Sequence, residues 1–176
     1  MRPTKGRALS RPANIKQLWQ DAHDGRWVMQ PKLNGDRVGL ACVDGKVYAQ
    51  NRHGSRYKFK IANAPDFLKL PNRTCFDGEV FKGNFYPFEC LASNEHSFLL
   101  AEVYERVLLA ENMMKSLGHP WLFGTPSLAW LLRRAANLPI YEGVVLKQRV
   151  PRTQSRYVML GTDKQSNLTW FKRRWT

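Results

Sequence analysis

The feature that most constrains the fold is a series of short apolar segments that alternate with turn residues through the first half of the chain. Asp44-Gly45 and Gly83-Asn84 are dipeptides typical of tight β-hairpin turns, and each lies between two strand-like segments. Because a tight turn joins antiparallel neighbours, the pattern predicts antiparallel sheet. The predicted strands are Trp27–Leu33, Arg37–Val43, Lys46–Asn51, Thr74–Lys82 and Phe85–Ala92.

The middle of the chain changes to a helical period. From Phe98 to Leu117 apolar residues recur every three or four positions, which predicts a helix that ends before Gly118. Thr125-Pro126 indicates the start of a second helix, which runs to about Asn137. The fold class that follows is α+β, with antiparallel sheets flanked by helices. The remaining predicted elements are a short helix capped by Asn14 and strands at Tyr141–Arg149, Tyr157–Leu160 and Leu168–Arg174.

The start of the chain reads as a surface segment. Residues 1–13 are basic and contain two prolines, so we interpret them as a basic N-terminal arm and residues 14–176 as one domain. The sequence has no signal-peptide pattern, and its apolar runs are too short to span a membrane. Its 3 cysteines lack CxxC spacing and fit reduced thiols. These features indicate a cytoplasmic monomer without a membrane partner.

The charge balance points to a polyanionic partner. The chain has 28 Lys and Arg against 14 Asp and Glu, a formal net charge of +14. Because neutralisation of phosphates dominates affinity for nucleic acids, a small basic domain is typical of a nucleic-acid-binding protein. A basic surface that is merely solvated would have the same composition.

Four segments carry residues suited to phosphate chemistry. Lys32 precedes a glycine turn in KLNGDR, where its amine can meet phosphates that approach the backbone. FDGE, which ends at Glu79, puts carboxylates inside a strand, where they are disfavoured unless something uses them. EGVVLK sets Glu142 and Lys147 at opposite ends of a strand, and WFKRR contains Lys172. Each has an ordinary structural explanation alone, but the ordered set indicates a nucleotide site.

This ordered set resembles the motifs of covalent nucleotidyltransferases, which comprise DNA ligases, RNA ligases and mRNA capping enzymes. KLNGDR is similar to the nucleophile motif KxDGxR, FDGE to the third motif, EGVVLK to the fourth and WFKRR to the fifth. PFE at Pro87–Glu89 resembles the aromatic and acidic pair that follows the third motif. NRHG at Asn51–Gly54 resembles the SRNG element of DNA ligases. The resemblance covers about residues 27–175 and favours an ATP-dependent DNA ligase with an ATP-grasp-like nucleotidyltransferase domain.

By this resemblance, Lys32 attacks the α-phosphate of ATP and carries AMP covalently. AMP then passes to a 5′-phosphate, and a 3′-hydroxyl displaces it to seal nicked duplex DNA, a reaction of DNA repair and replication. The attacking amine must be neutral, although an ordinary lysine pKa is about 10.4. A bound Mg²⁺ together with Lys147 and Lys172 would lower the pKa of Lys32 and neutralise charge on the phosphate.

The resemblance also implies which residues hold the ligands. Glu79 would contact the ribose, and Glu142 would bind the metal. The carboxylates of both residues are oxygen donors suited to Mg²⁺. Phe88 would stack on adenine, and Gln30 would meet the edge of that base. Lys32, Lys147 and Lys172 would be the catalytic residues and would contact the nucleotide. The residues implied to contact ribose or nucleic acid are Arg37, Arg52 and Arg174.

Three departures from the family pattern leave more than one function open. Asn34 stands where KxDG has aspartate, which gives weight to an RNA ligase, and Glu89 replaces an aspartate. The oligonucleotide-binding domain and sixth motif of DNA ligases do not follow Trp175. The sequence is then part of a longer ligase or a reduced enzyme whose basic arm contacts DNA. A GTP-using capping guanylyltransferase and a non-catalytic nucleic-acid-binding relic also fit these residues.

Overall fold

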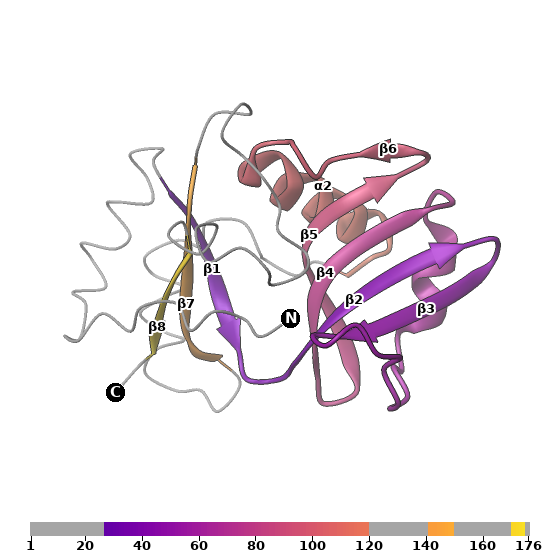
Figure 1. Cartoon of the computed structure of the whole chain (residues 1–176), viewed down its shortest axis with the longest axis horizontal. Coiled ribbons are helices and arrows are strands. Elements are labelled where there is room, and N and C mark those ends of the chain that lie inside the picture. Colours follow the sequence, from indigo (N-terminus) through magenta and orange to yellow (C-terminus); the bar gives the residue numbers. More distant parts are fainter. Residues whose placement is uncertain (1–26, 120–140, 150–169, 175–176) are drawn as a thin grey trace.

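Residues 27–119, 141–149 and 170–174 are described in the computed structural model of the chain, and they form two antiparallel sheets. The smaller sheet has the strand order β1-β7-β8, and the larger has the order β3-β2-β4-β5-β6 (Figure 1). The strands are β1 (Trp27–Leu33), β2 (Asp36–Val43), β3 (Lys46–Asn51), β4 (Thr74–Phe81), β5 (Asn84–Ser93), β6 (His96–Ser97), β7 (Tyr141–Gln148) and β8 (Trp170–Arg174).

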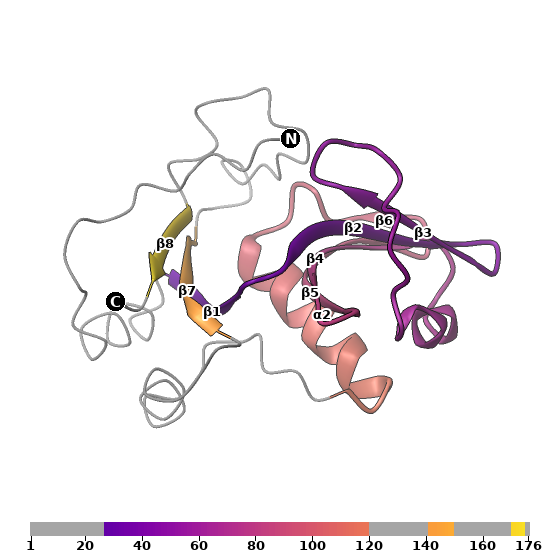
Figure 2. The same ribbon diagram turned by 90° about the horizontal axis from the view of Figure 1, so that it is seen from below.

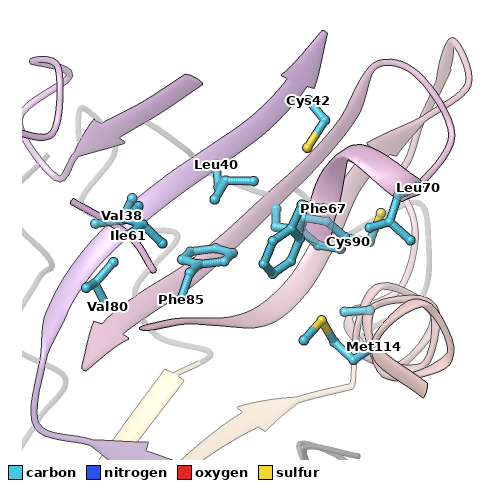
Figure 3. Close-up of a cluster of buried hydrophobic side chains, with 12 residues drawn as sticks. Val38, Leu40, Cys42, Ile61, Phe67, Leu70, Val80, Phe85, Cys90 and Met114 are labelled. Atoms are coloured by element: carbon cyan, nitrogen blue, oxygen red, sulfur yellow. The ribbon is translucent and has the colours of Figure 1, made fainter. Parts of the chain in front are cut away.

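One face of the larger sheet carries the main hydrophobic core. Alternate residues of β2, such as Val38 and Leu40, are buried there, as the period of two predicts. The 3₁₀ helix η1 (Ala64–Lys69) places the Phe67 ring edge-on against Phe76 and Phe85, with ring centroids 5.7 Å and 5.5 Å apart. Figure 3 shows Phe67 and Phe85 on this face of the sheet, together with Met114 of α2 (Val103–Ser116).

Helix α2 contacts both sheets. Val103 and Val107, in its first two turns, cluster with Val28 of β1, whereas Ala110 and Met114 join the core of the larger sheet. Figure 2 shows the start of α2 on the side of the smaller sheet and its end beneath the larger one. The helix therefore fixes the two sheets against one another, since a rigid element that packs on both resists their separation.

The predicted strands within the described residues are confirmed, with ends shifted by a few residues at most. The helix predicted from Phe98 begins instead at Val103, because Glu102 and Glu105 form a capping box there. Phe98 lies before the helix, where its backbone N–H donates to the Leu91 carbonyl and its side chain packs on the core. Its apolar side chain therefore reflects burial and not helical structure. The elements η1 and β6 were not predicted, since both are too short to show a period.

Several predicted elements lie outside the described residues: the basic arm, the helix at Asn14, the helix from Thr125 to Asn137 and the strand Tyr157–Leu160. Among the residues that are described, no helix is both long enough and apolar enough to cross a membrane.

Candidate active site

Two of the predicted site residues on the smaller sheet, Gln30 and Lys147, contact β5 of the larger sheet. Gln30 and Lys32 alternate along β1, and Gln30 stands opposite Val145 of β7 in the ladder. Gln30 is buried and donates from Nε2 to the carbonyl of Phe88 on β5 at 3.0 Å. Lys147, two residues along β7 from Val145, donates to Glu89 of the same strand β5. The facing strands therefore bring motif residues 58 positions apart in sequence into contact.

Lys32 lies at the end of β1, beside an irregularity in the ladder. Lys32 stands opposite Gly143, and Leu33 stands opposite Tyr141. Glu142 is thus an extra residue in β7 next to the Lys32 pairing. β-Bulges of this kind occur often next to active sites, where they redirect a side chain. The Lys32 side chain is half-buried.

The turn after Lys32 is fixed by contacts with β4. The Gly35 N–H donates to Glu79 Oε1 at 2.6 Å, so this carboxylate holds the turn that follows Lys32. A Cβ at Gly35 would lie well inside van der Waals distance of the Val80 carbonyl oxygen. Only glycine allows the backbone to cross from β1 to β2 so close to β4.

Arg37 is held by a carboxylate of the larger sheet. Its Nε and Nη2 donate to the two oxygens of Asp77 at 3.0 Å and 2.5 Å, a bidentate pair. Asp77 is buried, and Glu79, two residues further along β4, stands opposite Arg37 in the ladder. The guanidinium of Arg37 therefore has a fixed position beside Glu79.

Lys147, Glu89 and Arg106 form a buried ion triad. Glu89 accepts from Lys147 with one carboxylate oxygen and from Arg106 Nε with the other, the latter at 2.7 Å. The exposed fractions of the three side chains are 2%, 0% and 4%. Burial lowers the pKa of the Lys147 ammonium, and the neighbouring Glu89 carboxylate opposes that shift without cancelling it. The Lys147 Nζ also lies 5.6 Å from the centroid of the Phe88 ring.

Phe88 is placed by a second irregularity, in β5. Asp77 pairs with Glu89 and Gly78 pairs with Pro87, which leaves Phe88 as the extra residue of a bulge. Its ring is half-buried, and it packs on the cluster of Leu33 and Tyr86. The bulge and the hydrogen bond from Gln30 fix the backbone of Phe88, so the ring has a defined base from which to stack on a ligand.

The other predicted residues are more peripheral or are placed by their backbone alone. Arg52 is exposed in the loop after the edge strand β3, where its Nε donates to His53 Nε2 at 3.1 Å. In β8, Lys172 stands opposite Val145 and Arg174 stands opposite Gly143. Val145 also stands opposite Gln30, and Gly143 also stands opposite Lys32. Lys172 therefore lies in the same cross-strand row as Gln30, and Arg174 lies in the same row as Lys32.

The donors for a metal ion are few. In the described ranges no group of three or more His, Cys, Asp or Glu side chains is positioned to hold a metal by itself. Mg²⁺ in nucleotide sites commonly uses one or two carboxylates together with phosphate oxygens and water. The carboxylates of Glu79 and Glu142 fit that requirement in number and kind, provided that the nucleotide brings the remaining oxygen ligands.

Arg106 was missed by the sequence analysis, although the sequence contained a signal for it. The buried residues of α2 are Val103, Arg106, Val107, Ala110 and Met114. An arginine within an apolar helical stripe requires a buried anion, and Glu89 of PFE supplies it. The role of Asp77 as the partner of Arg37 was also missed, because it depends on the register of β2 against β4.

The fold is shared with solved ligases. No protein-family model matches the chain, and no curated protein sequence matches it. A mycobacterial DNA ligase D complexed with ATP aligns at 17% identity and a TM-score of 0.59, over 85% of this chain and 55% of that one. The ligase domain from M. tuberculosis LigD aligns at 19% identity and a TM-score of 0.64, over 85% and 54%.

A third structure, Pmar-Lig_PreS3, aligns at 16% identity and a TM-score of 0.58, over 88% of this chain and 44% of that one. The chain spans about half the length of these solved structures. It has the fold of a ligase nucleotidyltransferase domain.

Proposed function

We propose that the chain is the nucleotidyltransferase core of an ATP-dependent DNA ligase that seals nicked duplex DNA. The observation that supports the proposal is the placement of residues of the first, third and fourth motifs on strands and turns that contact one another. Lys32 is the residue before the last of β1, Glu79 accepts a hydrogen bond from the turn that follows, and Lys147 is buried on the neighbouring strand β7. The shared fold with solved DNA ligases supports the same function.

In the proposed first step, the Lys32 amine attacks the α-phosphate of ATP. A P–N bond forms, the bond to the β-phosphate breaks, pyrophosphate leaves, and the amine loses a proton. Lys147 and Lys172 would lower the pKa of the attacking amine by charge repulsion and would neutralise the phosphate oxygens. Mg²⁺, held by Glu142 and Glu79, would supply further positive charge at the phosphates.

In the following steps a 5′-phosphate oxygen of the nicked strand attacks the phosphorus of lysyl-AMP, which frees Lys32. The 3′-hydroxyl then attacks the activated 5′-phosphate, AMP leaves, and a phosphodiester bond is formed. Arg37 is suited to contact the ribose or the strand terminus, because Asp77 fixes its guanidinium. Arg52 and Arg174 would contact phosphates further along the strand.

The adenine would stack on Phe88, between the two sheets, in an ATP-grasp-like arrangement. Gln30 donates its amide N–H to the Phe88 carbonyl, so its Oε1 is the atom suited to accept a hydrogen bond from the adenine amino group. We further propose that residues 14–176 form the nucleotidyltransferase domain, that residues 1–13 contact DNA phosphates, and that the protein acts as a cytoplasmic monomer in repair or replication.

One observation favours an RNA ligase as the second candidate. Asn34 occupies the position of the aspartate in the nucleophile motif, a position at which RNA ligases vary. A pre-adenylylated nick with either deoxyribose or ribose at its 3′-hydroxyl end separates the two candidates. Faster sealing of the deoxyribose nick is expected of a DNA ligase, and the reverse preference would favour the RNA ligase.

Covalent labelling tests the proposed chemistry directly. After incubation with ATP and Mg²⁺, mass spectrometry should find one AMP on the peptide that contains Lys32. Lys32→Ala and Lys32→Arg should take no label, since a guanidinium stays protonated and cannot attack phosphorus. Lys115→Ala, at the exposed end of α2, is the matched control and should label normally. An unlabelled wild-type protein would contradict the proposal and favour a non-catalytic nucleic-acid-binding protein.

A further inference from the structure

We propose that one exposed face of the larger sheet is a docking surface for the nucleic-acid strand that leaves the site. We call it the β3 face and define it by Lys46, Tyr48, Gln50 and Arg56, with a floor of Gly39 and Ala41. The inference rests on the proposed function, because it names the surface by which the same site holds its nucleic acid. It lies on the edge strand of the sheet, beyond the motif residues.

The register places these residues on one face. Val38 and Leu40 of β2 point into the core, so Gly39 and Ala41, between and beyond them, lie on the opposite face. Residues directly opposite in an antiparallel ladder share a face. Gln50 is opposite Gly39, and Tyr48 is opposite Ala41.

The same rule extends the face to its ends. Lys46 alternates with Tyr48 along β3 and is exposed. An isolated bridge pairs Gln50 with Arg56, so Arg56 extends the row beyond the edge strand.

The β3 face is continuous with the candidate active site. Gly39 is opposite Asp77 on its other side, and Arg37, two residues before Gly39, is opposite Glu79. Asp77, Gly39, Gln50 and Arg56 therefore form one row across the sheet. Neighbouring strands lie about 4.8 Å apart, so Arg56 is about 14 Å from Asp77. A nucleic-acid strand that advances by about 3.4 Å per nucleotide covers this span in about four nucleotides.

The shape of the face suits a flat ligand. A Cβ built at Gly39 would lie 3.9 Å from its nearest heavy atom, the Phe76 carbonyl oxygen. The surface above Gly39 is therefore not filled by other side chains. Tyr48 is 54% exposed and stands beside this floor. An exposed aromatic ring on an open sheet, flanked by cations, is the arrangement on which nucleic-acid bases or sugars stack.

The charge of the segment is complementary to phosphate. Residues 45–65 include five Lys or Arg and no Asp or Glu. Arg56, Lys58 and Lys60 are exposed, and within the described part of the chain no carboxylate lies within salt-bridge distance of them. Asp36, which accepts a hydrogen bond from the Tyr57 hydroxyl at 3.1 Å, and Asp44, two residues before Lys46, are the nearby acids in the sequence and contacts of this segment, so its net charge remains positive. Exposed cations in excess attract a polyanion, and the continuity with the proposed site for nucleotide phosphates favours nucleic acid over an acidic protein or a lipid surface.

Binding of a fluorescent nicked DNA duplex, measured by anisotropy over a range of salt concentrations, tests the β3 face. Lys46→Ser/Arg56→Ser should weaken binding and reduce the slope of log affinity against log salt by about 2, since each phosphate contact contributes about 0.9. Tyr48→Ser should weaken binding about tenfold without a change in slope, because stacking releases no counterion. Lys69→Ser/Lys115→Ser removes the same charge from η1 and α2 and should leave the slope unchanged.

Labelling of Lys32 with AMP separates this inference from the proposed function, because that step needs no nucleic acid. All four proteins should label equally. If the Lys46→Ser/Arg56→Ser protein labels and binds DNA as the control does, the β3 face is not the docking surface, although the ligase proposal stands. If the variants lose DNA binding as expected while no protein is labelled, the ligase proposal fails and the surface stands. Binding to phosphatidylserine vesicles is the remaining comparison. If the wild-type protein binds these vesicles and the variants do not, while DNA binding is unchanged, the surface is assigned to membranes and the inference is overturned.

Discussion

Lys147 on β7 donates a hydrogen bond to Glu89 on β5, so one buried ion pair joins the two sheets. Arg106 of α2 occupies the other oxygen of the same carboxylate. The position of the fourth-motif lysine therefore depends on a helix that contains none of the family motifs. Arg149, two residues after Lys147, pairs with Glu102 at the start of α2 at 2.5 Å, which ties the same strand to the same helix.

Replacement of Glu89 tests this triad. Glu89→Gln should lower the free energy of unfolding by about 3–5 kcal/mol, because it removes the carboxylate that two buried cations share. Urea denaturation measures the change. Arg106→Met/Glu89→Leu/Lys147→Met should regain most of the lost stability, since apolar side chains replace the ions, yet it should not label with AMP. A Glu89→Gln protein as stable as the wild type would show that the triad is not ionised.

Two glycine substitutions form a matched pair at the nucleophile turn. Gly35→Ala should strongly reduce labelling of Lys32, because the added Cβ would collide with the Val80 carbonyl and displace the turn. Gly39→Ala, where the nearest atom is 3.9 Å away, should label normally. Labelling rates and thermal unfolding of both proteins check the expectation. Normal labelling of Gly35→Ala would mean that the turn does not set the position of the lysine.

The bidentate pair of Arg37 and Asp77 predicts a difference between arginine and lysine. Arg37→Lys should cost about 1–3 kcal/mol of stability, since lysine cannot reproduce two parallel hydrogen bonds to the buried carboxylate. Arg73→Lys is the control, because its pair with Glu95 is exposed, with side-chain exposed fractions of 57% and 71%. That control should change stability by less than about 0.5 kcal/mol. Equal effects of the two substitutions, measured by urea denaturation, would argue against a special role for the buried pair.

The cysteines predict a loss of stability at alkaline pH. Burial raises the pKa of Cys90 from 9.0 to about 12 and that of Cys42 to about 11. Because the folded state holds these protons more tightly than the unfolded state, their contribution is complete below about pH 9 and is lost as pH rises towards 12. Unfolding free energies at about pH 8 and pH 10 should show the decline. Cys90→Ala should start less stable, because of the cavity, and should decline less between the two pH values.

Most of the larger sheet could be predicted from the sequence, because its strands alternate in a simple period and its turns carry glycine. The first and third motif residues could be placed on strands for the same reason. The partners of those residues could not, since the pairing of Arg37 with Asp77 depends on strand register across 40 positions of sequence. The bulges at Phe88 and Glu142 likewise depend on how two strands pair, and the local sequence of one strand does not predict that pairing.

The close approach of Gly35 to β4 leaves the connection between the two sheets without spare length. Lys32 is therefore anchored to the same backbone that carries Val80 and Glu79, and the lysine cannot travel towards a distant ligand by loop movement. In the proposed reaction the phosphate donor must therefore come to the amine, so the choice among donors would depend on how well each one fits against this fixed turn. Redesign of the site for a bulkier donor would have to begin with the backbone of β4, because the Val80 carbonyl limits the path of the turn that carries the lysine.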